Sequence, residues 1–115
     1  MNLLLATFLL LISAAAIGFY LVYLGLRQRK RSSGLGLMHA GLALTGSIVL
    51  FTAIFTGPID KLNNVAALFL FFAILGGGMV FALHEKNRPP AMAAVTVHAI
   101  MGMVAILLLI INLFY

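Results

Sequence analysis

Residues 89–113 read PPAMAAVTVHAIMGMVAILLLIINL, and this stretch decides the fold. After its two prolines it is almost wholly apolar, and His98 is its one ionisable side chain. The stretch is long enough to cross a bilayer, which takes about 20 residues. An imidazole inside such a segment is costly, so His98 is a candidate functional residue.

Three more segments have the same character, and the chain between them is short. The sequence is 64% hydrophobic and 8% charged, whereas a soluble domain is about half apolar and a quarter charged. The predicted fold class is therefore all-α, a polytopic membrane four-helix bundle with up-down-up-down topology, formed by one domain over residues 1–115. The predicted helices cover residues 3–26, 35–55, 65–84 and 90–113.

The net charge of +5 comes from basic residues grouped in two short loops, 27–31 and 86–88. This grouping argues against nucleic acid as a partner and predicts that both loops are cytoplasmic. Both termini are then non-cytoplasmic, and we expect a protein of the bacterial inner membrane. Cysteine is absent, which excludes a disulfide framework and an iron–sulfur site.

A second histidine suggests an internal repeat. A shift of 59 positions carries His39-Ala40 onto His98-Ala99. Small residues follow each histidine at +4 and +7, positions that share its helix face. They are Ala43 and Gly46 in the first half, and Gly102 and Ala105 in the second.

Both histidines open the second helix of a hairpin that follows a basic loop, as in a parallel repeat. The repeat predicts that they face each other, about 8 Å and about 12 Å into their helices. Two opposed imidazoles beside small residues suit a haem b, with the histidines as iron ligands. Cations for its propionates would be Arg27, Arg29, Lys30, Arg31, Lys86 and Arg88. Simple hydrogen bonds to a neighbouring helix, another metal and quinone contact stay open as alternatives.

Histidines on the second and fourth of four membrane helices resemble the bis-histidine b-type cytochromes, broadly the cytochrome b561-like group. The resemblance implies that His39 and His98 ligate haem b. It also implies electron exchange with quinones, ascorbate or partner proteins. Two-haem members need four histidines at two depths, but this chain has three. At most one bis-histidine haem is therefore expected, and His84 is expected at the interface.

Other small membrane classes fit less well. The small multidrug transporters depend on a carboxylate in the first helix, and no acidic residue precedes Asp60 here. Two functions remain: a haem b electron-transfer protein within a larger redox complex, or a structural accessory subunit without a cofactor. Small-residue patches at 14–18 and 76–78 predict a homo-oligomer or a larger membrane complex, surrounded by lipid.

Overall fold

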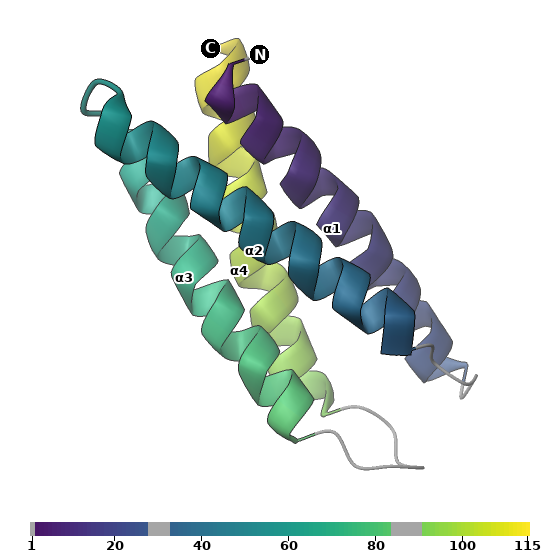
Figure 1. Ribbon diagram of the computed structural model, residues 1–115. Coiled ribbons are helices and arrows are strands. Elements are labelled where there is room, and N and C mark those ends of the chain that lie inside the picture. The colour runs from purple at the N-terminus through teal and green to yellow at the C-terminus, as the bar shows by residue number, and fades with distance from the viewer. Residues whose placement is uncertain (1, 28–32, 84–90) are drawn as a thin grey trace.

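The computed structural model describes residues 2–27, 33–83 and 91–115, which form four α-helices and no strand. Each helix is long and apolar enough to cross a membrane. The predicted all-α membrane four-helix bundle is thus confirmed. The helices are α1 (Leu3–Leu26), α2 (Ser33–Thr56), α3 (Lys61–Ala82) and α4 (Met92–Phe114) (Figure 1).

The start of α3 differs from the prediction. The Asp60 carboxylate accepts hydrogen bonds from the N–H groups of Leu62 and Asn63, which caps the first turn. The helix therefore begins at Lys61 and not at residue 65. Its polar first turn has the composition of a loop, yet the side chain of Asn63 is paired within the bundle. Its oxygen accepts a 2.7 Å hydrogen bond from the Asn112 amide of α4.

The other helix bounds lie within two residues of the predictions. α2 covers Ser33–Thr56 where 35–55 was expected, and α3 ends at Ala82 where 84 was expected. α4 begins at Met92. Pro89 and Pro90 were expected to open this helix, and they lie outside the described residues. The predictions for His84 and for most of the two basic loops lie outside the described residues.

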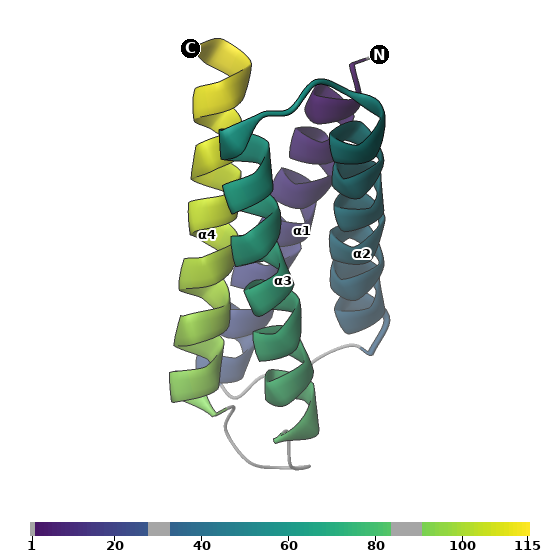
Figure 2. The ribbon, with the colours of Figure 1, turned by 90° about the vertical axis from the view of Figure 1, so that its left-hand side faces the viewer.

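The helices form two antiparallel hairpins, α1–α2 and α3–α4, each tightly packed within itself. The hairpins also contact each other through α1 with α4 and α2 with α3, but less closely. Both termini lie at one end of the bundle (Figures 1 and 2). From that end the α1–α2 hairpin diverges from the α3–α4 hairpin toward the opposite end, as Figure 1 shows.

The buried positions of the two hairpins repeat at the same spacing as the histidines. A shift of 59 positions relates three pairs of hydrophobic residues that are all at most 5% exposed. α2 and α4 begin at Ser33 and Met92, which are related by the same shift. The predicted two-hairpin repeat thus extends through the core of the bundle. The pairs are Leu11 and Leu70, Ala14 and Ala73, and Leu50 and Leu109.

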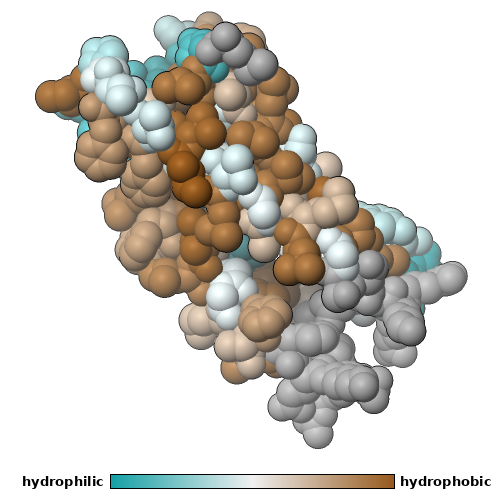
Figure 3. All heavy atoms as spheres, in the orientation of Figure 1, coloured by the Kyte–Doolittle hydropathy of each residue, from teal (hydrophilic) through white to brown (hydrophobic). Residues whose placement is uncertain are grey.

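The outer surface of the bundle is apolar. Large side chains such as Leu37, Phe55 and Phe81 are 74%, 83% and 84% exposed. Figure 3 shows apolar side chains over most of the described part of one face. A monomeric soluble protein rarely exposes so large an apolar area. The surface is that of a protein surrounded by lipid, as the four spanning helices among the described residues require.

Candidate functional site

The structure brings His39 and His98 together across the bundle. His39 lies six positions after the first residue of α2, Ser33, and His98 lies six positions after the first residue of α4, Met92. Both are half-buried. Their ring centroids are 5.9 Å apart, and the ring planes meet at 81°. The repeat predicted that the two histidines face each other at matching depth, and the structure places them in that way.

A backbone carbonyl of the preceding helix holds each ring. Nδ1 of His39 lies 2.7 Å from the Ala14 oxygen on α1, and Nδ1 of His98 lies 2.6 Å from the Ala73 oxygen on α3. A carbonyl oxygen only accepts, so Nδ1 carries the proton in both rings. In a neutral imidazole the other nitrogen, Nε2, then keeps an unprotonated lone pair, as a metal ligand requires.

Neither Nε2 atom has a hydrogen-bond partner among the described residues. In the same part of the chain, every fully buried side-chain nitrogen or oxygen has a partner. Each Nε2 atom therefore retains some accessible surface. The two lone pairs therefore have no protein partner among the described residues.

Glycines on the facing helices make the close approach of both rings possible. A Cβ built on Gly18 would lie 2.9 Å from Cε1 of His39, and one on Gly77 would lie 3.0 Å from Cε1 of His98. A Cβ on Gly76 would lie 3.3 Å from the Cα of His98, so the backbones of α3 and α4 are also close there. Each imidazole thus packs where the facing helix has no side chain.

The small residues at 14–18 and 76–78 were predicted to serve association with another chain, and that association stays a prediction. Gly18, Gly76 and Gly77 lie against histidines within the chain. The signal for this contact in the sequence is the shift of 59 positions, which relates Ala14 to Ala73 and Gly18 to Gly77 on the helices that face the histidines.

The four small residues predicted beside the rings lie in different surroundings. A Cβ on Gly46 would be 2.9 Å from Cδ2 of Leu11, and Ala105 is fully buried in the core cluster. Both positions are therefore used for packing between helices. Ala43 is half-buried, and its carbonyl accepts the Ser47 hydroxyl. A Cβ on Gly102 would have no neighbour within 4 Å.

The donors at this site are two imidazoles. No group of three or more His, Cys, Asp or Glu side chains gathers anywhere in the described ranges. A tetrahedral zinc site needs three or four such ligands. The pair instead suits a centre that takes two protein ligands and brings its remaining donors with it.

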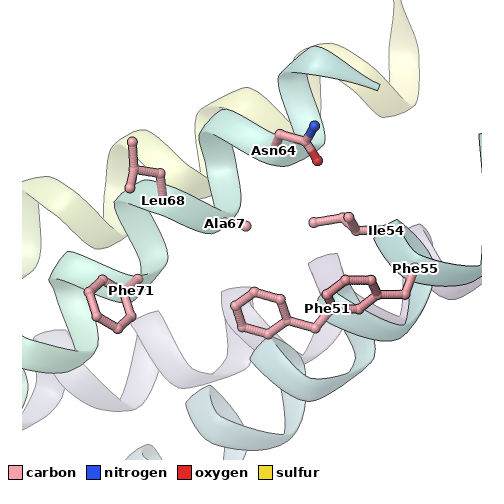
Figure 4. A pocket seen from close by; sticks show the side chains of 7 residues that line it. All are labelled: Phe51, Ile54, Phe55, Asn64, Ala67, Leu68 and Phe71. Atoms are coloured by element: carbon pink, nitrogen blue, oxygen red, sulfur yellow. The ribbon is translucent and has the colours of Figure 1, made fainter. Parts of the chain in front are cut away.

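A separate apolar groove of about 350 Å³ lies between α2 and α3 (Figure 4). Phe51, on its wall, is twelve residues from His39, or about 18 Å along the helix axis. Ala67 lines the groove, and the residue at the related position of α1 is Phe8, which packs against the core. The groove therefore reflects a difference between the two hairpins, which have Phe8 and Ala67 at related positions. Its lining residues are Phe51, Ile54, Phe55, Asn64, Ala67, Leu68 and Phe71.

Arg27 is the one cation of the predicted propionate set within the described residues. Its guanidinium carbon lies 5.7 Å from the centroid of the Tyr23 ring, at the end of α1. The other five cations, with His84, fall outside those ranges. No family model, curated protein or solved structure matches this chain.

Proposed function

We propose that the chain binds one haem b between His39 and His98 and serves as a membrane electron-transfer protein, as a subunit or partner of a larger redox complex. The observation that carries the proposal is the pair of facing imidazoles with free Nε2 lone pairs. Polar groups at such depth are expensive, and their presence there points to a function.

The ring spacing would allow both imidazoles to ligate one metal ion. Each ligating imidazole nitrogen lies about 2 Å from its metal, which puts the ring centroids about 6 Å apart. The observed separation is 5.9 Å. An edge-to-face pair of rings has the same spacing, so the free Nε2 atoms are the observation that favours a metal.

The two helices that carry the histidines do not pack against each other. α2 and α4 lie diagonally in the bundle and have no close backbone contact among the described residues. The hairpins diverge toward the end that holds the histidines (Figure 1). Gly102, one helical turn after His98, faces open space. Gly46 and Ala105 are occupied in the core, so Ala43 and Gly102 are the better candidates for contact with a macrocycle.

When bound, haem supplies a one-electron iron couple. The residues of the chain hold it and adjust it. The Ala14 and Ala73 carbonyls accept hydrogen bonds from the Nδ1–H groups, which orients each ring and leaves Nε2 as the ligating nitrogen. The helices around the pair are apolar, which lowers the polarity of its surroundings. Both effects bear on the reduction potential of a bound haem.

The test is expression of the full chain with haem supplied, followed by a pyridine haemochrome assay on the purified protein. We expect one haem per chain and a low-spin reduced spectrum. Because the ring planes are nearly perpendicular, the oxidised form should give a strongly anisotropic low-spin EPR signal. His39→Ala or His98→Ala should each remove the low-spin spectrum.

His84→Ala is the matched control, because it removes the third histidine and leaves the facing pair intact. Its spectrum should equal that of the unmodified protein. A folded but colourless preparation would refute haem binding. A low-spin spectrum that survives loss of either His39 or His98 would show that haem binds but that the facing pair does not ligate it.

The second candidate function is a structural accessory subunit without a cofactor. One observation favours it: each imidazole already bonds a neighbouring helix through Nδ1, as a purely structural histidine would. The proposal also includes three kinds of partner: the surrounding lipid, a second copy of the chain, and a quinone or protein redox partner. The haemochrome assay separates the two functions, because a structural subunit stays colourless.

A further inference from the structure

We propose that Gly18 and Gly77 are positioning residues, which hold the two facing histidines in the Nδ1–H tautomer and so keep both Nε2 atoms free. Nδ1 carries the proton because the facing helix presents a backbone carbonyl to it. An uncovered backbone carbonyl is needed, and a glycine uncovers it in each hairpin.

The first hairpin shows how this works. In an α-helix the carbonyl of residue i accepts the N–H of residue i+4 and keeps a second lone pair. The side chain at i+4 points back over that turn and would cover the oxygen. On α1 these positions are Ala14 and Gly18. A Cβ on Gly18 would lie 2.9 Å from Cε1 and 3.2 Å from Nδ1 of His39, so any other residue would displace the ring.

The second hairpin repeats the arrangement with different neighbours. The Ala73 carbonyl lies 2.6 Å from Nδ1 of His98. A Cβ on Gly77 would lie 3.0 Å from Cε1 and 3.2 Å from Nδ1 of that ring. The carbonyl and the histidine are 25 residues apart in both hairpins. Two occurrences of one geometry, on helices that otherwise differ in most side chains, indicate a shared requirement.

The requirement concerns which nitrogen is left free. A neutral histidine side chain in water prefers the Nε2–H tautomer, which would place a proton on the accessible nitrogen. The carbonyl bond reverses this preference in both rings. The consequence for a metal rests on the proposed haem function, whereas the tautomer itself does not. Loss of such a second partner typically weakens metal binding about 10–100-fold.

The experiment is ¹⁵N NMR of the full chain, labelled at histidine and purified without haem in detergent micelles. Protonated and unprotonated ring nitrogens resonate in separate ranges. We expect Nδ1–H and unprotonated Nε2 for His39 and His98. Gly77→Ala should shift His98 toward the Nε2–H tautomer and leave His39 unchanged. Gly18→Ala should do the reverse.

Gly78→Ala is the matched control, because a Cβ there has no neighbour within 4 Å although the residue adjoins Gly77. It should leave both tautomers unchanged. An Nε2–H tautomer at either histidine of the unmodified protein would overturn the inference, even if no glycine variant folds. So would a Gly77→Ala protein whose His98 keeps the Nδ1–H form.

Haem titration of the same preparations gives a second readout. Gly77→Ala should weaken haem binding about 10-fold or more relative to Gly78→Ala. If the tautomers behave as expected and no preparation binds haem, the proposed function fails and the positioning role of the glycines stands. If haem binds but the tautomers ignore the glycines, the inference fails and the function stands.

Discussion

At the residue scale, two kinds of glycine stand out among the described residues. Gly18, Gly46 and Gly77 lie where a Cβ would collide with a neighbouring side chain. Gly41 and Gly78 face open space. These kinds look alike in the sequence, because the distinction depends on which residue of another helix comes opposite. The missing Cβ atoms, and not helix propensity, decide how closely the helices of each hairpin approach.

Gly46 provides a test of this distinction. A Cβ there would lie 2.9 Å from Cδ2 of Leu11 and 3.3 Å from Cβ of Leu10. We expect Gly46→Leu to destabilise the haem-free bundle by about 1–3 kcal/mol, the usual cost of overpacking. The measurement is unfolding in mixed micelles. Gly41→Leu is the control and should change stability by less than about 0.5 kcal/mol. Equal stability of the two variants would contradict the packing role of Gly46.

At the element scale, each hairpin is a tightly packed unit that supplies one imidazole and the carbonyl that holds it. The hairpins differ at the end away from the histidines. There α3 and α4 share the Asn63–Asn112 hydrogen bond, and the related positions of the first hairpin are Leu4 and Ala53. The second hairpin therefore has a polar connection between its helices that the first one lacks.

The asparagine pair should show a measurable coupling energy. Hydrogen bonds between helices in membranes contribute about 0.6–2 kcal/mol. A double-mutant cycle with Asn63→Ala and Asn112→Ala should give a coupling in that range, because either single variant already removes the bond. Unfolding in mixed micelles measures the three variants against the unmodified chain. Strict additivity of the two substitutions would show that the bond contributes nothing.

The sequence predicts the helices well because each is a long apolar segment, but it predicts contacts between them poorly. The start of α3 was missed since the cap by Asp60 and the Asn63–Asn112 bond make polar residues part of a helix. The histidine pair was found because the repeat carries His39 onto His98. The residues that hold the rings lie on the facing helices, and only the register of each hairpin shows which turn they occupy. For the same reason Gly46 and Ala105 were assigned to the site and belong to the core.

At the scale of the whole molecule, the bundle has two unlike ends. One holds both termini and the close-packed core, and the other holds the histidines (Figures 1 and 2). Each histidine lies about 9 Å from the start of its helix, since six residues rise about 1.5 Å each. The haem that we propose would therefore lie near one face of the membrane. Transfer of an electron across the full bilayer would then need a second centre on a partner.

The orientation of the bundle decides which face that is. Six of the seven Lys and Arg residues fall in the two segments that follow α1 and α3, and Lys61 alone lies at the other end. Positively charged segments next to membrane helices stay in the cytoplasm. We therefore predict that Tyr115 is non-cytoplasmic and that the histidines lie toward the cytoplasmic face.

Reporter fusions check this orientation. A reporter that is active only outside the cytoplasm should work when fused after Tyr115, and also when inserted after Gly57, between α2 and α3. The same reporter inserted within residues 28–32 should be inactive. A reporter that is active only in the cytoplasm should give the opposite pattern. If that second reporter works after Tyr115, the bundle is inverted, and the histidine pair lies toward the non-cytoplasmic face.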